Sequence, residues 1–433
     1  MRRMISDQLA YINIAKDWFT VSDLAEINQR KIGQGKIGGK SAGMLLALRI
    51  LSEVADTEIL SHLSIPDSYF LGADVMYTFM SVNNLMHWND QKYRSEEQIR
   101  AEYPQIVEQY MQGVFPDDIL EELEHLLQKL AKKPLIIRSS SLLEDNFGTS
   151  FAGKYDSIFC PNQGSPQENL RELTRAIAQV YASTLNPDAL LYRRSKGLQD
   201  YDERMAILIQ VVKGEFIGNY YLPHAAGVAF SRNSFRWSPE IRSEDGFVRL
   251  VWGLGTRAVD RIGDDYPRLV ALSHPLLQPE DSSKAIRRYS QQFVDVIDLE
   301  QNSFQTLPIT QVLDPHYPVL RYIAEVDQGG YLSPIRSLIR EEDLDKLVLT
   351  FDQLLNRTRL ADRMREMLKI LETHYKAPVD TEFTVRIKDP GTIQPEAEIC
   401  ILQCRPQSHF KDSQAQLPKN LPEKDIIFAT SRM

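Results

Sequence analysis

The chain has 433 residues, of which 43% are hydrophobic and 25% are charged, as expected for a globular protein with more than one subdomain. Its formal net charge of −9 argues against a general nucleic-acid-binding or acidic-membrane-binding protein. The cysteines at 160, 400 and 404 lack the paired spacing of a zinc site, and no apolar run is long enough to cross a membrane. We therefore expect a cytoplasmic protein with reduced thiols.

A glycine-rich loop at residues 31–44 follows a predicted helical segment at 1–30 and leads into a run with helical apolar spacing. Such a loop before a helix can bind an anion, because free amide groups and the helix dipole face it. Dinucleotide-binding and Walker patterns do not fit: no hydrophobic strand precedes the loop, and Gln34 stands where a Walker loop needs glycine. We expect Lys40 to begin a helix among glycines that let a phosphate approach. The alternative is a flexible loop that caps a helix.

A buried strand is predicted at residues 135–140, and Arg138 lies near its end. The segment 139–153 that follows is rich in hydroxyl-bearing, small and glycine residues. A segment of this composition can fold over phosphates, and a solvated turn fits the composition equally well. A helix is then expected over 166–194, before a buried strand at 205–212 whose one polar side chain is Gln210.

Two further strands are predicted at 225–231 and 247–252, and Gly253-Leu254-Gly255 ends the second of them. Charged residues follow, namely Arg257, Asp260, Arg261, Asp264, Asp265 and Arg268. A run of charges usually forms a solvated surface, but this one directly follows a glycine turn at a strand end. A long helix with an acidic start is expected over residues 341–375.

The last ordered element predicted is a hairpin of two strands, at 379–387 and 397–406. Asp380 and Glu382 share one face of its first strand, and Gln403 and Arg405 share one face of its second. Carboxylate oxygens suit Mg²⁺, and a guanidinium suits phosphate. The alternative is an ordinary hairpin with a cross-strand ion pair between Glu382 and Arg405, which is a common arrangement.

Together these segments resemble the ATP-binding module of phosphoenolpyruvate synthase and pyruvate phosphate dikinase, which has relatives in rifampicin phosphotransferase and glucan water dikinase. The resemblance extends in order through most of residues 30–408. The matching motifs are Gly38-Gly39-Lys40-Ser41-Ala42, Ile137-Arg138-Ser139-Ser140 with Glu144-Asp145 and Ser150-Phe151-Ala152-Gly153, Ile209-Gln210-Val211-Val212, Ala226-Gly227-Val228-Ala229-Phe230, Gly253-Leu254-Gly255, Asp380-Thr381-Glu382 and Leu402-Gln403-Cys404-Arg405-Pro406.

The resemblance implies an α+β protein with the ATP-grasp fold, in which the nucleotide cleft lies between two mixed α/β subdomains. The implied divisions are a helical extension at 1–30, an N-terminal subdomain at 31–204, a C-terminal subdomain at 205–408 and a peripheral tail at 409–433.

The resemblance also implies a role for each matching residue. Lys40 and Arg138 would bind the ATP phosphates, Gln210 would line the adenine side, and Gly253 and Gly255 would lie near the phosphates. Glu382 and Gln403 would lie near Mg²⁺, with Asp380 supporting them and Arg405 on the phosphoryl group that is transferred.

Two departures from the family pattern affect the expected function. Thr256 stands where the family usually has glutamate, which puts the triphosphate grip and the nucleotide preference in doubt. None of the eight histidines lies in a Thr-Ser-His-type motif, so we expect no phosphohistidine domain and no substrate barrel. The expectation is an ATP-dependent phosphotransferase module that needs a separate phosphohistidine-bearing protein or another acceptor. The alternatives are a nucleotide sensor without turnover and one half of a split dikinase.

Overall fold

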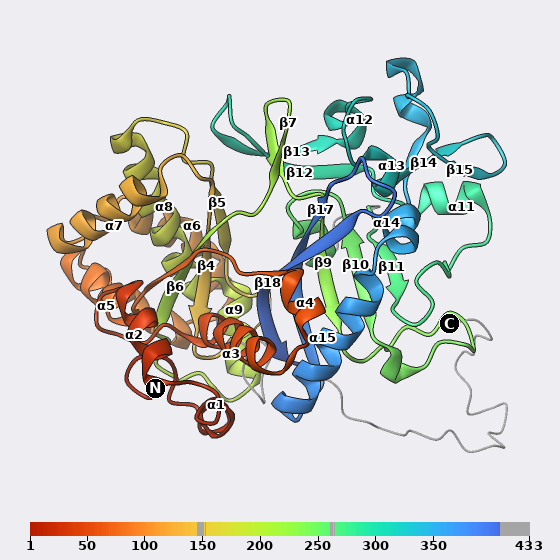
Figure 1. Cartoon of the computed structure of the whole chain (residues 1–433). Coiled ribbons are helices and arrows are strands. Elements are labelled where there is room, and N and C mark those ends of the chain that lie inside the picture. The colour runs from red at the N-terminus through yellow and green to blue at the C-terminus, as the bar shows by residue number, and fades with distance from the viewer. Residues whose placement is uncertain (145–150, 152, 260–262, 264, 408–433) are drawn as a thin grey trace, which may run out of the picture.

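The computed structural model of the chain describes residues 1–144, 151, 153–259, 263 and 265–407, and within these its strands form four sheets (Figure 1). Residues 145–150 and 152 of the predicted phosphate loop, residues 260, 261 and 264 of the charged run, and the tail at 409–433 lie outside the described residues. None of the helices in the described part combines the length and the apolar character that crossing a bilayer requires.

The first sheet has five strands and lies in the left half of Figure 1. In spatial order its strands are β1 (Lys31–Ile32), β3 (Ser68–Leu71), β6 (Met205–Val211), β4 (Leu135–Ser141) and β5 (Ser157–Cys160). The helices that share a core with it are α5 (Ala73–Val82), α6 (Glu96–Met111), α7 (Asp117–Leu130), α8 (Pro166–Ala182) and α9 (Pro187–Ser195). In α7, Ile119, Leu123 and Leu127 recur at helical spacing and are buried, so this helix packs by one apolar face.

The second sheet has six strands and carries the predicted hairpin. In spatial order its strands are β11 (Arg268–Ala271), β10 (Phe247–Val251), β9 (Ala225–Phe230), β17 (Val379–Lys388), β18 (Glu396–Pro406) and β2 (Leu63–Ser64). Two long helices, α3 (Gly39–Val54) and α15 (Leu360–Tyr375), pack against this sheet. The chain thus crosses between the halves early. The helix α3 packs against the second sheet and β2 is one of its strands, although both precede most strands of the first sheet.

Two smaller sheets extend the second half of the molecule. One comprises β13 (Ser303–Pro308), β12 (Phe293–Asp298), β8 (Tyr220–Leu222) and β7 (Glu215–Ile217), and the other β15 (Leu332–Pro334), β14 (Ala324–Asp327) and β16 (Leu347–Leu349). The remaining helices are α1 (Leu9–Ala15), α2 (Val21–Gln29), α4 (Thr57–Ser61), α10 (Thr256–Val259), α11 (Ser283–Arg288), α12 (Ile309–Val312), α13 (Leu320–Ile323) and α14 (Asp352–Arg357), with 3-10 turns η1 (Met86–Tyr93), η2 (Ser183–Leu185), η3 (Ser243–Asp245) and η4 (Glu341–Lys346).

Three segments differ from the expectations drawn from the sequence. The long helix expected over 341–375 is wrong: η4, β16, α14 and α15 occupy it, since β16 pairs with β14. The helix expected over 166–194 is interrupted by η2, and Pro187, which has no N–H to donate, begins the new helix α9. The strand β6, expected to open the C-terminal subdomain at 205, lies inside the first sheet between β3 and β4, so a division by sheets falls after Val211.

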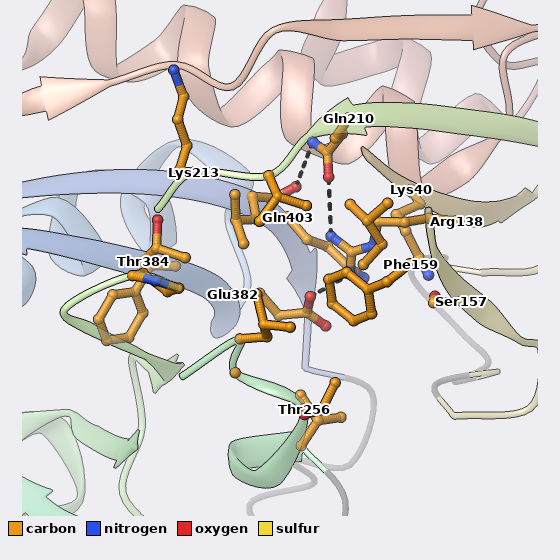
Figure 2. Close-up of a pocket in the computed structure, with 18 of the residues that line it drawn as sticks. Lys40, Arg138, Ser157, Phe159, Gln210, Lys213, Thr256, Glu382, Thr384 and Gln403 are labelled. Atoms are coloured by element: carbon orange, nitrogen blue, oxygen red, sulfur yellow. Dashed lines mark hydrogen bonds and ion pairs between the residues drawn. The ribbon is translucent and has the colours of Figure 1, made fainter. Parts of the chain in front are cut away.

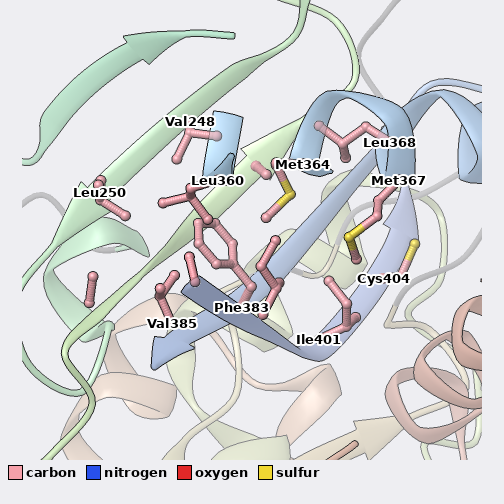
Figure 3. Close-up of a cluster of buried hydrophobic side chains, with 14 of the residues drawn as sticks. Val248, Leu250, Leu360, Met364, Met367, Leu368, Phe383, Val385, Ile401 and Cys404 are labelled. Carbon is pink, nitrogen blue, oxygen red and sulfur yellow. The ribbon is translucent and has the colours of Figure 1, made fainter. Parts of the chain in front are cut away.

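The helix α15 fixes the hairpin β17–β18 from behind (Figure 3). Figure 3 shows side chains of α15 facing the sheet; the buried residues involved are Leu360, Met364, Met367 and Leu368 of α15, Val248 and Leu250 of β10, Phe383 and Val385 of β17, and Ile401 and Cys404 of β18. This packed layer holds the polar face of the hairpin in place on the opposite side of the strands.

A β-bulge interrupts the hairpin at the site. Glu382 pairs with Gln403 and the next residue, Phe383, pairs with Ile401, so Leu402 has no partner on β17. Because a bulge changes which way the following side chains point, Leu402 and Gln403 both line the same cavity while Ile401 packs in the core.

Candidate functional site

A cavity of about 390 Å³ is lined by residues from both large sheets. The first sheet contributes β4, β5 and β6, and the second contributes β17 and β18; Lys40 of α3 and Gly255 also line it. Of the predicted site residues, those that line it are Lys40, Arg138, Gln210, Gly255, Glu382, Gln403 and Arg405. Asp380 is buried and pairs with Arg405, whereas Gly253 packs on the backbone of Asp295 and is not among the lining residues.

The glycines before Lys40 serve a close approach of protein backbone. Gly38 has φ +82°, and a Cβ placed there would lie 1.5 Å from the carbonyl oxygen of Ser140. A Cβ on Gly39 would lie 2.1 Å from the carbonyl oxygen of Glu144. We expected a phosphate to approach these glycines; in the structure the end of β4 and Glu144 fill that space, which brings Lys40 beside Arg138's strand.

The amide groups of the glycine loop also have protein partners. Gln34 N and Gly35 N donate to the carboxylate of Asp74 at 2.8 and 2.6 Å, and Ser41 N donates to Ser140 Oγ at 3.0 Å. The anion held by the loop is therefore a side chain of the protein itself. What the loop contributes to the cavity is Lys40, whose side chain is buried.

Lys40 is paired with Glu144. Their Nζ and Oε1 atoms are 3.3 Å apart, and both side chains are buried. Two further groups hold the carboxylate, because Ser139 Oγ donates to Oε1 at 2.9 Å and Ser141 N donates to Oε2 at 3.0 Å. Glu144 thus positions Lys40 at the edge of the cavity.

Arg138 lines the cavity and joins the two sheets, and Figure 2 shows it between Gln210 and Glu382. Its Nη1 donates to Gln210 Oε1 of β6 at 3.3 Å, while its Nη2 donates to Gln403 Oε1 of β18 at 2.9 Å and to the carboxylate of Glu382 on β17. Its buried Nε has no hydrogen-bond partner in the part of the chain that the structure describes. The guanidinium therefore keeps one donor for a further group.

Arg405 pairs with Asp380 across the hairpin, with Nε and Oδ1 2.7 Å apart. Among the described residues, Glu382 pairs with Arg138, so the alternative hypothesis of an ordinary cross-strand ion pair between Glu382 and Arg405 is wrong. Three buried or half-buried ion pairs meet here, Lys40–Glu144, Arg138–Glu382 and Arg405–Asp380.

The two carboxylates on β17 have opposite pKa shifts. Burial raises the pKa of Asp380 above its ordinary value, and Arg405 only partly opposes this effect. Burial acts on Glu382 as well, but the charges of Arg138, Lys40 and Arg405 outweigh it and lower the pKa of Glu382. Glu382 is therefore the carboxylate more firmly held in its charged form, as a cation ligand needs.

Asp295 on β12 holds the turn Gly253-Leu254-Gly255. Its backbone oxygen accepts from Leu254 N at 3.1 Å, and its carboxylate accepts from Thr256 Oγ1, Arg257 Nε and Thr306 Oγ1. Gly253 and Gly255 have φ +102° and +91°, which favour glycine. Thr256, the departure from the family pattern, is thus engaged with Asp295 at the cavity wall.

The described residues of the charged run after this turn, Arg257, Asp265 and Arg268, do not form a solvated surface. Arg257 is buried between Asp295 and Asp265, and Arg268 is buried against the backbone oxygen of Thr350 and the carboxylate of Asp352. These pairs brace the turn against β12 and α14.

An apolar part of the cavity lies beside Gln210. Its lining residues are Ile136, Phe159, Val212, Leu254 and Leu402. Gln210 itself is bound on all sides: its Nε2 donates to Met44 Sδ at 3.0 Å and to Ser68 Oγ and Leu402 O at 3.4 Å, and its Oε1 accepts from Arg138. Its amide therefore orients Arg138 and links β6 to β18.

The lining residues that the sequence did not single out include Phe159, Lys213 and Thr384 (Figure 2). Lys213 directly follows the predicted strand at 205–212, so the strand-end position that singled out Arg138 would have found it as well. Thr384 lies on the same face of β17 as Asp380 and Glu382. Phe159 had no signal, because the short strand β5 was not predicted.

The residues present fit a Mg²⁺ ion that is shared with phosphates. Among the described residues no three His, Cys, Asp or Glu side chains form a metal cluster. The carboxylate of Glu382 and the amide oxygen of Gln403 do stand opposite each other across β17 and β18. Magnesium is commonly held by one or two protein oxygens with substrate phosphates completing its shell. The unpartnered Arg138 Nε and the buried Lys40 supply donors for such phosphates.

Comparison with known proteins identifies the family. The family model described as "Pyruvate phosphate dikinase, AMP/ATP-binding domain" matches residues 34–425. A rifampicin phosphotransferase of Streptomyces sviceus is 28% identical over 166 residues, which make up 38% of this chain and 17% of that protein. An uncharacterized phosphotransferase of Bacillus subtilis, YvkC, is 25% identical over 174 residues, 40% of this chain and 17% of that protein. The match to each relative thus spans less than a fifth of that relative's length. Since the family match covers most of the chain, the protein belongs to the family of the pyruvate phosphate dikinase AMP/ATP-binding domain and has a fold of the ATP-grasp type.

Proposed function

We propose that the cavity binds ATP together with Mg²⁺ and that the module transfers a phosphoryl group from ATP to an acceptor on another molecule, such as a separate phosphohistidine-bearing protein. The observation that carries the proposal is that three ion pairs, Lys40–Glu144, Arg138–Glu382 and Arg405–Asp380, meet at one cavity between two sheets. Membership of an ATP-binding family and the phosphotransferase names of two relatives support it.

The proposed division of labour follows from charge. Lys40 and Arg138 bind the phosphates, and Arg405, held by Asp380, contacts the phosphoryl group that moves. Glu382 and Gln403 hold Mg²⁺, which neutralises phosphate charge and aligns the phosphate oxygens when it is bound. Phosphoryl transfer requires this positioning and charge stabilisation more than a covalent step on the protein.

The adenine is proposed to lie in the apolar part of the cavity. Phe159, Val212 and Leu254 provide apolar surface there, and the charged groups around Arg138 line the same cavity. A planar base with an apolar face is stabilised by such surroundings. Gln210 would serve the phosphate end through Arg138.

Titration calorimetry with ATP and excess Mg²⁺ tests the proposal. We expect binding with a dissociation constant on the order of micromolar to millimolar, the usual range for enzyme substrates. Arg405→Ala should weaken binding at least about tenfold, because it removes a half-buried charge that is proposed to meet phosphate. The matched control is Arg386→Ala, an exposed arginine on the neighbouring strand whose affinity should equal that of the unchanged protein. Absence of any heat of binding would contradict the proposal.

Transfer is tested with ATP labelled at the β- or the γ-phosphate, Mg²⁺ and a cell extract. If a protein or small molecule becomes labelled with the unchanged protein but not with Arg405→Ala, the result supports transfer and identifies the acceptor.

A second candidate function is a nucleotide sensor without turnover, and the engagement of Thr256 with Asp295 favours it. It predicts thermal stabilisation by ATP with no label transferred under any partner condition. A third candidate, one half of a split dikinase, predicts a neighbouring gene that encodes a Thr-Ser-His motif.

A further inference from the structure

The proposed metal oxygens already have a cation between them. Nη2 of Arg138 donates both to the carboxylate of Glu382 and to Gln403 Oε1. These two residues face each other on β17 and β18, and the guanidinium reaches them from β4 of the other sheet. The charge and the donor of Arg138 thus occupy the lone pairs that a metal ion would need.

We propose that Arg138 is a built-in counter-ion at this position, so that a divalent cation binds to Glu382 and Gln403 only when nucleotide phosphates draw the guanidinium away. The inference rests on the proposed function and adds to it an obligatory coupling between metal and nucleotide.

Geometry makes the two occupants mutually exclusive. Magnesium–oxygen distances are about 2.1 Å, so an ion shared by Glu382 and Gln403 would lie within the space that Nη2 takes up, 2.9 Å from Gln403 Oε1. Two cations so close, beside the buried Arg138 and Gln403, would also repel each other strongly. One of them has to leave before the other binds.

Arg138 has a way to leave without losing every partner. Gln210 holds Nη1, and the amide of Gln210 is itself fixed by Met44, Ser68 and Leu402. The Nε atom has no partner among the described residues and can donate to a phosphate oxygen. A turn of the guanidinium about its contact with Gln210 would exchange Glu382 for phosphate while the arginine stays in the cavity.

Exchange of partners makes the coupling reciprocal. Phosphate that withdraws Arg138 raises the affinity for metal, and metal on Glu382 removes the competitor that holds Arg138 back from phosphate. Each ligand alone must break the Arg138–Glu382 pair. Metal alone leaves Arg138 without a carboxylate, and nucleotide alone leaves Glu382 without a cation, so one charge stays unpaired in the site. Metal alone and nucleotide alone are therefore both expected to bind weakly.

The test uses Mn²⁺ alone as the probe, with free Mn²⁺ measured by electron paramagnetic resonance at pH 8 and no nucleotide present. The unchanged protein should bind Mn²⁺ only weakly. Arg138→Met should bind it at least about tenfold more tightly, because Glu382 then lacks its counter-ion. Arg386→Met, which loses an exposed arginine on the same strand as Glu382, should behave like the unchanged protein. The double variant Arg138→Met with Glu382→Gln should lose the gain.

Equal Mn²⁺ affinity in the unchanged protein and in Arg138→Met would overturn the inference. Arg138→Gln, which keeps hydrogen-bonding groups but not the charge, replaces the methionine variant if that one fails to fold. Calorimetry of the unchanged protein with ATP and Mg²⁺ on the same preparation separates the two proposals. If ATP binds but the Arg138 variants gain no Mn²⁺ affinity, only the counter-ion role is refuted. Absence of ATP binding refutes the proposed function.

Discussion

His224 is a buried residue that directly precedes β9 and lies beside the end of β17. Its Nδ1 accepts a hydrogen bond from the backbone N–H of Ile387 at 2.8 Å. Burial disfavours the charged ring, and the nearby charge of Arg386 adds to this, so the pKa of His224 falls to about 4 from its ordinary value of 6.5. The folded protein thus holds His224 neutral at pH values where the unfolded chain takes up a proton.

This difference predicts an acid-dependent loss of stability. Because the folded pKa lies below the unfolded one, the contribution is present above pH 6.5 and is lost as the pH falls toward 4. The free energy of unfolding should drop by about 2 kcal/mol between pH 7 and pH 5 on account of this residue. His224→Asn keeps an acceptor for Ile387 but does not titrate, so urea unfolding at the two pH values should show a correspondingly smaller drop. His316→Asn, at an exposed histidine, should leave the drop unchanged.

At the residue scale the sequence predicted which charged side chains meet, but not how they pair. Lys40, Arg138, Glu382, Gln403 and Arg405 all line one cavity. Their roles in binding stay predictions. The partner of Glu382 lies 244 positions earlier in the chain, on another sheet, and no local pattern encodes such a pairing. A hairpin considered alone offers Arg405 as the arginine on the neighbouring strand, which is why the cross-strand pair was the natural alternative.

The helix α15 is held to the second sheet by one buried arginine as well as by its apolar face. Arg363 has an exposed fraction of 2% and donates to Glu58 before β2, to Glu396 on β18 and to the backbone oxygen of Ala397. Three segments that are distant in sequence thus meet on a single guanidinium. Because α15 supports the hairpin from behind, this contact also supports the cavity.

Arg363→Met should destabilise the protein by about 3 kcal/mol, near the lower end for a broken buried ion pair, since Glu58 and Glu396 are partly exposed. Arg365→Met on the same helix is the matched control. Arg365 is exposed and pairs with exposed Asp362, so its loss should change the free energy of unfolding very little. Urea unfolding at neutral pH measures both, and equal effects of the two substitutions would contradict the assignment.

Periodic elements were predictable and their interruptions were not. The helix α3 and the strands β4, β6, β9, β10, β17 and β18 are present where the patterns placed them. The expected helix at 341–375 failed because Leu347-Val348-Leu349 also suits a buried strand, and pairing with β14 decided the outcome. Phe351, at φ +58°, then separates this strand from α14. The bulge at Leu402 likewise depends on register between strands, which the pattern of one strand does not determine.

At the scale of the whole molecule, several contacts join the first sheet to the second half across the cavity. Besides Arg138, Phe159 of β5 stacks on Phe304 of β13 with ring centroids 5.3 Å apart, and Gln163 N donates to Asn302 Oδ1 at 2.9 Å. Phe159 also lines the cavity. The hairpin of β12 and β13 therefore contacts the turn Gly253-Leu254-Gly255 through Asp295. It also contacts the proposed adenine side of the cavity through the stacking of Phe304 on Phe159.

The order of the motifs along the chain led to the correct fold type, whereas the partition of the chain into halves could not be derived from that order. A division at 204/205 follows a change from helix to strand, yet β6 pairs with β3 and β4. Similarly, α3 and β2 come from the first part of the chain, but α3 packs against the second sheet and β2 is a strand of it. Chain crossings of this kind are set by long-range packing, which no single segment records.

The three ion pairs have a kinetic consequence. Among the described residues, each positive group of these pairs is matched by a carboxylate, and the remaining charged lining residues, Lys213 and Asp156, also cancel. The described lining and its paired carboxylates thus have no net charge, in a chain whose formal charge is −9. Such a site exerts no long-range attraction on the polyphosphate anion, unlike sites that present unpaired lysines and arginines.

The association rate constant of a fluorescent ATP analogue, measured by stopped flow with Mg²⁺, should therefore change by less than about twofold between low and physiological ionic strength. Glu144→Gln, which leaves Lys40 without its carboxylate, should bind faster at low ionic strength and slow as salt is added. If the association rate constant of the unchanged protein falls steeply as ionic strength rises, the ion pairs are already open in solution. If the rate is flat, capture relies on random encounter, and selectivity for ATP over other anions arises only after the nucleotide has entered and the pairs exchange.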